Sequence, residues 1–127
     1  MRTPLPTILL LTAAMALSAC QSASVGGFRS TVRNGLAAAE LAGSVGYLDR
    51  SRALRAEYQA LEFGATGAPI SWQGWSDRRG SVIPGPKYRV NSFDCRNYSH
   101  SVVVGGATEV ARGTACRQPD GSWHLNA

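Results

Sequence analysis

The chain has 127 residues, enough for one domain plus a targeting segment. Hydrophobic residues make up 44% of the chain, which excludes a protein that is disordered throughout. The formal net charge is +5 and comes almost entirely from arginine, since Lys87 is the only lysine; such a surface favours anionic neighbours such as phosphate-bearing lipid or lipopolysaccharide, and the alternative is a generic basic surface without a specific partner.

Residues 1–19 have the parts of a signal peptide. Arg2 supplies the positive start, and 8–17 form an apolar core of about ten residues, which is too short to span a bilayer. The core ends in Leu17-Ser18-Ala19-Cys20, a quartet that resembles the lipobox of bacterial lipoproteins. The resemblance implies cleavage before Cys20, and lipidation of Cys20 by a diacylglycerol and an N-acyl chain such as palmitate. The alternative is an ordinary secretory signal followed by an incidental cysteine.

Lipidation of Cys20 would place the protein in the cell envelope. More than one acyl chain gives stable anchoring in a membrane, whereas a single chain is marginal. Position 21 is glutamine and not aspartate. By analogy with lipoprotein sorting in well-known envelopes, this favours export to the outer membrane.

Small residues dominate the segment that follows. Residues 20–34 are predicted to be the lipidated N-terminus and a flexible linker rich in Ser, Gly and Ala. In 35–48, Gly35, Ala39 and Gly43 recur every four residues, the spacing of a glycine zipper. This segment is too short for a transmembrane helix. We predict a short helix or a membrane-surface segment, and a loosely ordered connector is the alternative because glycine weakens helices.

The clearest helix is predicted over 49–63. Asp49 suits the N-cap, where its oxygen would accept an orphan amide hydrogen bond, and Gly64 suits the left-handed position after the last turn. Leu54, Tyr58 and Leu61 form one apolar stripe. We expect this helix to cover one face of a sheet; a partner-binding helix is the alternative.

The remaining chain is rich in strand and turn signals. We predict strands at 70–72 and 81–84, followed by two strands that contain Cys95 and Cys116 and by a last strand at 122–125. Pro84 and Pro86 cannot donate to a ladder, so the far end of the second strand should be an edge or a break. The expected fold class is α+β: within one domain, 49–127, an N-terminal helix packs on a small antiparallel β-meander of four to five strands.

A cross-strand disulfide is predicted between Cys95 and Cys116. If Gly105 and Gly106 form a two-residue hairpin turn, Val104 faces Ala107, and counting outward pair by pair sets Cys95 opposite Cys116. The pair falls at a non-hydrogen-bonded position, where Cα atoms approach to about 4.5 Å, a separation that a disulfide accepts. The alternative is a pair of buried free thiols.

Several runs in 49–127 are distinctive in combination: Asp49-Arg50 with Ala60-Leu61-Glu62, the TGAPISW run at 66–72, Cys95-Arg96, Gly105-Gly106, and above all GTACRQPDGSW at 113–123. With them the segment resembles the C-terminal domain of the 17-kDa surface-antigen family of bacterial outer-membrane lipoproteins. Family members usually carry a longer glycine-zipper region, and the 35–48 segment resembles a shortened one. The resemblance implies a surface-antigen-type envelope lipoprotein with a structural or interaction role.

No constellation of residues predicts an active site. His100 lies on the opposite face from both cysteines in this register, so a Cys2His2 zinc site with His124 is not expected. The sequence has no Gly-x-Ser-x-Gly elbow, no phosphate-cradling loop and no basic helix for nucleic acid. We predict no enzyme activity, no cofactor and no metal.

Five residues are candidates for binding, and packing against the helix is the alternative use of their aromatic rings. If they form an aromatic and arginine groove, the protein would instead be a periplasmic ligand-binding or inhibitor module. Anionic lipid, lipopolysaccharide or other envelope proteins are the partners that such a surface would suit. The candidates are Trp72, Trp75, Arg78, Arg79 and Trp123.

Overall fold

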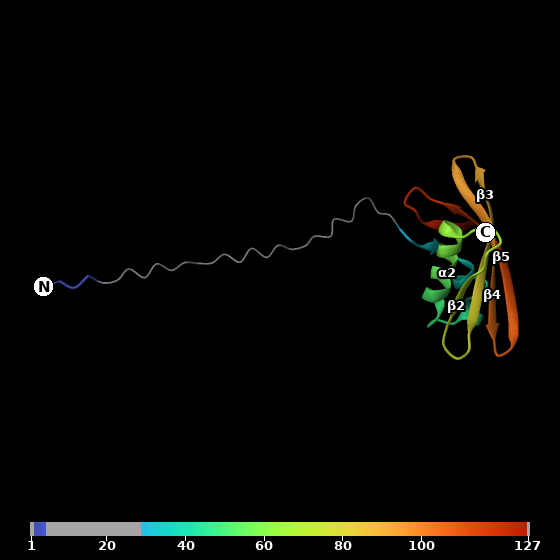
Figure 1. Cartoon of the computed structure of the whole chain (residues 1–127), viewed down its shortest axis with the longest axis horizontal. Helices are drawn as coiled ribbons and strands as arrows, with labels where there is room; N and C mark the ends of the chain where they lie inside the picture. The colour runs from blue at the N-terminus through green and yellow to red at the C-terminus, as the bar shows by residue number, and fades with distance from the viewer. Residues whose placement is uncertain (1, 5–28, 127) are drawn as a thin grey trace.

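The structure is a computed structural model that describes residues 2–4 and 29–126 (Figure 1). The helices are the 3-10 helix η1 (Leu36–Ala38), the short α1 (Ala42–Val45) and the long α2 (Arg50–Phe63). The strands are β1 (Val32–Arg33), β2 (Ile70–Gln73), β3 (Arg79–Val90), β4 (Phe93–Val104), β5 (Ala107–Arg117) and β6 (Trp123–Asn126).

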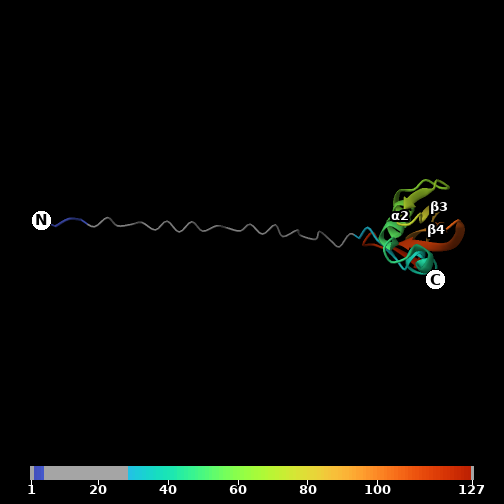
Figure 2. The ribbon, with the colours of Figure 1, turned by 90° about the horizontal axis from the view of Figure 1, so that it is seen from below.

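Within the described residues the strands form one six-stranded sheet in the order β1-β6-β5-β4-β3-β2. Neighbouring strands are antiparallel except for β1, which runs parallel to β6. Figures 1 and 2 show the sheet curled, with α2 lying against one of its faces. Residues that face α2 form the core, because strand side chains alternate between the two faces; the buried core includes Leu36, Leu61, Trp72, Val82, Tyr98, Val102, Ala111, Ala115 and Trp123.

The predicted hairpin register is confirmed. Gly105 and Gly106 both have positive φ values, 56° and 82°, as a two-residue turn of this kind requires. Val104 faces Ala107, and Cys95 faces Cys116. These cysteines form the predicted disulfide, with their Cα atoms 4.0 Å apart. In the chain-entropy model, a crosslink that closes a loop of this length stabilises the fold by roughly 3 kcal/mol.

The predicted meander of four to five strands is wrong. The described sheet is mixed and has six strands, because residues assigned to the linker form β1 and pair parallel with β6. Val32 is buried, and the Trp123 amide donates to the Thr31 carbonyl at 2.9 Å. A strand of two residues carries no alternation that could be read in the sequence, so only its distant partner reveals it.

The edge expected at Pro84 and Pro86 is present, and the strand bulges there without breaking. β3 continues through both prolines and its register shifts between Pro84 and Lys87, after which Lys87 pairs with Arg96. Pro84 lies where β2 has already ended, so its missing amide removes no ladder hydrogen bond. The strand predicted at 81–84 therefore extends over Arg79–Val90.

The expectations for α2 are partly confirmed. The helix spans Arg50–Phe63, close to the predicted 49–63. Asp49 is at the N-cap position, but its side chain makes no capping hydrogen bond, and Gly64 is extended (φ −69°, ψ 139°) instead of left-handed. Both differences arise because distant side chains and loops supply the partners, as described below.

The 35–48 segment is not one continuous helix. η1 and α1 are separated by 39–41, and Ala39 and Gly43 are exposed. Gly35 is buried, and a side chain there would collide with the Glu57 carboxylate. Within the described residues, no helix is long and apolar enough to cross a membrane.

Candidate functional site

Two of the five candidate binding residues belong to the core. Trp72 is buried, and its indole N–H donates to His100 Nε2 at 2.8 Å. Trp123 is fully buried, and its indole N–H donates to Glu62 Oε2 at 2.7 Å. They lie on β2 and β6, which are separated by three strands. The five residues therefore do not share one groove. Cys20, the predicted lipidation site, lies outside the described residues.

Trp75, Arg78 and Arg79 remain on the surface, in or next to the loop between β2 and β3. Trp75 is 63% exposed. This loop contacts the start of α2: the Trp75 amide donates to both Asp49 carboxylate oxygens, at 3.1 and 3.2 Å. Figure 1 shows the start of α2 and this loop at the same end of the domain. Asp49 thus ties the loop to the helix instead of capping the helix.

The turn that precedes α2 adds two further exposed apolar side chains to this end. Tyr47 is 84% exposed and Leu48 is 72% exposed. The Arg50 guanidinium carbon lies 5.9 Å from the centre of the Tyr47 ring, within cation–π range. We call this surface the basic–aromatic end; it comprises Tyr47, Leu48, Arg50, Arg52, Trp75, Arg78 and Arg79.

The basic–aromatic end is held in place by further contacts. Arg52 Nη1 donates to the Gln73 carbonyl at 3.1 Å, and the Arg78 guanidinium lies against Gly46. Asp49 is buried, so Asp77 is the exposed acid within the described loop between β2 and β3, next to Arg78 and Arg79. Exposed aromatic side chains flanked by arginines are typical of surfaces that contact an anionic membrane interface.

A fully buried polar network lies between α2 and the sheet. His100 Nδ1 and Glu57 Oε1 are 2.8 Å apart, and neither side chain is exposed. An indole N–H can only donate, so His100 Nε2 must accept from Trp72 and Nδ1 must donate to Glu57. The Ala37 amide also donates to Glu57 Oε1 at 3.0 Å. A carboxylate–histidine pair occurs in acid–base sites, but here Trp72 occupies the second ring nitrogen and no face of the ring reaches solvent.

Tyr98 completes this network. Its hydroxyl donates to Glu57 Oε2 and accepts from the Leu36 amide, each at 3.3 Å. Burial raises the pKa of Tyr98 most, and the negative charge of Glu57 raises it further, so this pKa lies well above its usual value. The network therefore joins η1, α2, β2 and β4. Its only sequence signal was the position of His100 among the helix-facing residues of β4, between Tyr98 and Val102.

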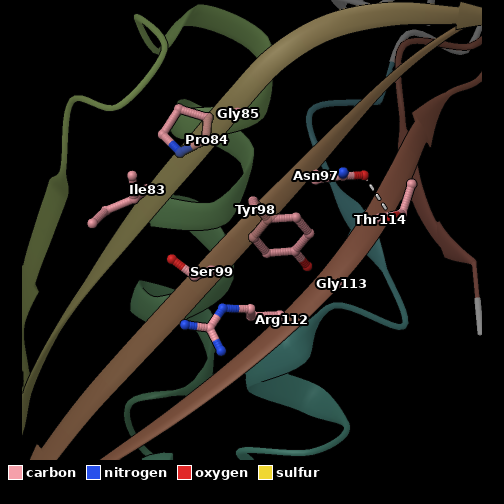
Figure 3. A pocket seen from close by; sticks show the side chains of 9 residues that line it. All are labelled: Ile83, Pro84, Gly85, Asn97, Tyr98, Ser99, Arg112, Gly113 and Thr114. Atoms are coloured by element: carbon pink, nitrogen blue, oxygen red, sulfur yellow. Dashed lines mark hydrogen bonds between the residues drawn. The ribbon is translucent and has the colours of Figure 1, made fainter.

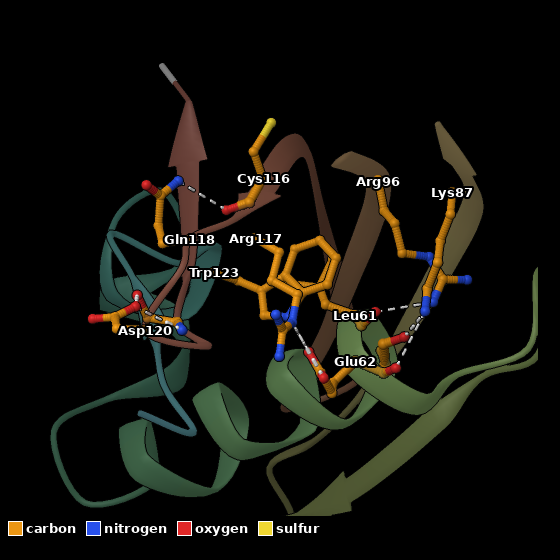
Figure 4. Close-up of polar contacts among 11 residues, drawn as sticks. Leu61, Glu62, Lys87, Arg96, Cys116, Arg117, Gln118, Asp120 and Trp123 are labelled. Atoms are coloured by element: carbon orange, nitrogen blue, oxygen red, sulfur yellow. Dashed lines mark hydrogen bonds and ion pairs between the residues drawn. The ribbon is translucent and has the colours of Figure 1, made fainter. Parts of the chain in front are cut away.

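A second polar cluster holds the end of α2 (Figure 4). Arg96 is 2% exposed, and its Nη1 donates to the carbonyls of Ala60, Leu61 and Gly64 at 2.9–3.0 Å. Burial lowers the pKa of Arg96 from its usual value. A cation at this place satisfies orphan carbonyls and complements the helix dipole. Arg96 thus satisfies the carbonyls at the end of α2, a role predicted from the sequence for a left-handed Gly64.

Glu62 connects the same helix end to the GTACRQPDGSW run. It accepts from Trp123, and from Arg117 Nε at 3.0 Å. Partial burial by itself raises the pKa of Glu62, but the hydrogen bonds from Arg117 and Trp123 and the charges of Arg117 and Lys87 lower it further, so the pKa lies below its usual value. Two residues of this run, Arg117 and Trp123, therefore join the sheet to the end of α2.

The sheet face turned away from α2 carries a hollow of about 480 Å³ (Figure 3). Asn97 Oδ1 accepts from the Tyr88 hydroxyl at 2.9 Å and from Thr114 Oγ1 at 2.8 Å, which fixes the amide at its rim. The other lining residues are Ile83, Pro84, Gly85, Tyr98, Ser99, Arg112 and Gly113. In the part of the chain that the structure describes, no cluster of three His, Cys, Asp or Glu side chains could hold a metal ion.

Comparison with known proteins gives relatives named 17 kDa surface antigen. The chain is 40% identical over 79 residues to a 17 kDa surface antigen of Rickettsia bellii, a match of 61% of this chain and 50% of the relative. It is 38% identical over 79 residues to that of Rickettsia conorii, and 38% over 69 residues to that of Rickettsia prowazekii. No family model matches, and no solved structure matches. The chain spans about half the length of these curated relatives.

Proposed function

We propose that the protein belongs to the 17 kDa surface antigen family, as these matches support, and that it is a lipid-anchored lipoprotein of the outer membrane with a structural or interaction role and no enzyme activity. The observation that carries the proposal is how the three cysteines are used. Cys20 is the last residue of the lipobox-like quartet, and Cys95 and Cys116 are joined to each other. Each thiol therefore has one assigned use, and none remains free.

Export to the periplasm or the cell surface would agree with this use of the cysteines. Structural disulfides persist in the periplasm and on the cell surface, whereas the cytosol keeps thiols reduced. The Cys95–Cys116 pair is thus consistent with a chain that is exported, as a signal peptide before Cys20 requires. The name of the matched relatives, surface antigen, favours the same location.

The tether length would keep the domain close to the lipid. The nine residues from Cys20 to Phe28 can span at most about 30 Å. The described domain begins at Arg29, whose amide donates to the Asp120 carbonyl at 2.6 Å. A domain held within this distance of a bilayer would repeatedly contact headgroups. We assign that contact to the basic–aromatic end, with anionic lipid as its partner.

The test of the anchor is Cys20→Ala in the full chain, expressed in a bacterial host. We expect an uncleaved precursor without acyl chains, whereas the unaltered chain should carry acyl mass on the fragment that contains Cys20 and remain in the outer-membrane fraction. Ser22→Ala, two residues away, is the matched control and should be processed normally. An acyl-free native chain, or a Cys20→Ala chain with unchanged cleavage and acylation, would show that the proposal is wrong.

The alternative, a periplasmic binding or inhibitor module with an aromatic groove, loses its main support. The groove needed Trp72 and Trp123 on the surface, and both are buried with their indole N–H groups occupied.

A further inference from the structure

β5 has an open edge over its first seven residues. It pairs with β4 from Ala107 onward, but β6 pairs only with Thr114 to Arg117. Ala107 to Gly113 therefore has β4 on one side and, among the described residues, no strand on the other. In Figure 1 this half of β5 lies at the outer side of the sheet.

The turn geometry tells which backbone groups face outward. A two-residue turn at Gly105 and Gly106 makes Val104–Ala107 a hydrogen-bonded pair, and such pairs then alternate along the ladder. The amides and carbonyls of Ala107, Glu109, Ala111 and Gly113 thus point to β4. Those of Thr108, Val110 and Arg112 point away from it, and no described residue bonds with these six groups.

The other edges of the sheet are protected in ways that this one is not. β1 has only two residues, and the Gln73 carbonyl at the edge of β2 accepts from Arg52. The edge of β3 beyond β2 carries Pro84, Pro86 and Lys87, with a bulge between them. Short strands, proline, lysine and bulges are the usual protection against strand pairing. Residues 107–113 contain no proline, no lysine and no bulge. The charged side chains on this edge are Glu109, which accepts a hydrogen bond from Ser44 of α1, and Arg112.

The side chains along the open edge indicate which residues an added strand would need. Val110 is 52% exposed on the outer face. Arg112 is exposed beside the hollow of Figure 3, and within the described residues it forms no ion pair or hydrogen bond. On an added strand, the side chains directly opposite lie about 4.5–5.5 Å away. A carboxylate would therefore complement Arg112, and an apolar side chain would complement Val110.

We propose that the open edge of β5 binds an extended acidic segment of another protein by strand addition. Main-chain hydrogen bonds to Thr108, Val110 and Arg112 supply the affinity, and an acidic residue opposite Arg112, two positions from an apolar residue opposite Val110, supplies the specificity. This proposal does not depend on lipidation of Cys20.

A second copy of the chain is a poorer occupant. Two β5 edges related by a two-fold axis at Val110 would set Arg112 opposite Thr108, which leaves the guanidinium without a carboxylate. The same rotation, about an axis normal to the sheet, would point the two basic–aromatic ends in opposite directions. Charge complementarity therefore favours a foreign acidic strand.

The test uses unacylated, isotope-labelled chain of residues 20–127 carrying Cys20→Ala, and the peptide acetyl-Ser-Glu-Ser-Val-Ser-Thr-Ser-amide. In an antiparallel arrangement its Glu faces Arg112 and its Val faces Val110. We expect amide NMR shifts concentrated at 107–113 and slowed amide exchange at Thr108, Val110 and Arg112. Replacing Glu by Lys in the peptide, or Arg112→Gln in the protein, should weaken binding about tenfold, because one charge-assisted contact is lost.

Val110→Pro is the second variant. The Val110 amide points outward, so proline removes a donor from the open edge and none from the β4–β5 ladder. It should abolish the slowed exchange while the dispersed spectrum of the folded domain is kept. Shifts centred on another surface, or equal affinity for the Glu and Lys peptides, would overturn the proposal. Concentration-dependent self-association through 107–113 without peptide would overturn it in favour of a second copy.

Discussion

His100 has two ring nitrogens and two fixed partners. Trp72 donates to one nitrogen, and the other donates to Glu57. These partners lie 28 and 43 residues away in the chain, so no local pattern connects them. The sequence did predict which side of β4 His100 faces, because alternation along a strand is local. It could not predict the contact, which depends on how β2 and α2 meet over β4.

We predict that His100→Ala lowers the free energy of unfolding by about 3 kcal/mol, because a buried indole N–H and a buried carboxylate each lose a partner. The measurement is urea unfolding followed by circular dichroism. Ser99→Ala, the half-buried neighbour on the other face, is the control and should change stability by no more than about 0.5 kcal/mol. Equal effects of the two substitutions would contradict a structural role for the network.

Among the elements, local signals succeeded and distant pairings failed. The 49–63 helix and the hairpin around Gly105-Gly106 were predicted correctly, because helix propensity and turn chemistry act over a few residues. β1 was missed because its only partner, β6, is about ninety residues away. The end of α2 was misassigned for the same reason: its carbonyls are satisfied by Arg96 from β4 and not by the residue that follows the helix.

Arg96 supplies the second stability prediction. Arg96→Met keeps a long side chain but leaves the carbonyls of Ala60, Leu61 and Gly64 without their buried donor, and should cost about 3 kcal/mol or more. Arg112→Met removes the same charge from an exposed position and should cost less than about 0.5 kcal/mol. The measurement is the midpoint of urea unfolding, compared between the two variants. A similar midpoint for both would mean that water caps the helix equally well.

For the whole molecule, the binding surface emerged only from the assembled fold. The sequence pointed to Trp75, Arg78 and Arg79 but also to Trp72 and Trp123, since exposed and buried indoles look alike in a sequence. Tyr47 and Leu48 were not predicted to belong to the surface. They join it because Asp49 binds the backbone of the distant loop at Trp75.

The basic–aromatic end should bind anionic vesicles without help from acyl chains. Unacylated chain of residues 20–127 carrying Cys20→Ala is expected to bind vesicles that contain phosphatidylglycerol, and to bind phosphatidylcholine vesicles far more weakly. Trp75 is the one exposed indole of the three, so a blue shift of tryptophan fluorescence on binding reports its burial. Trp75→Ala should abolish that shift, while the signal from Trp72 and Trp123 stays constant.

Two double variants that remove the same charge from different surfaces test the role of the arginines at the basic–aromatic end. Arg50→Gln with Arg78→Gln should weaken vesicle binding roughly thirtyfold, since each arginine near an anionic surface contributes about 1 kcal/mol. Arg33→Gln with Arg112→Gln removes the same charge from β1 and β5 and should have a much smaller effect, because Arg33 lies at the opposite edge of the sheet and Arg112 pairs with Ser99, four residues along β4 from Val103, the partner of Arg79. Co-sedimentation at two salt concentrations measures both pairs. If the two double variants lose the same affinity, binding follows net charge alone and the basic–aromatic end is not the membrane-facing surface.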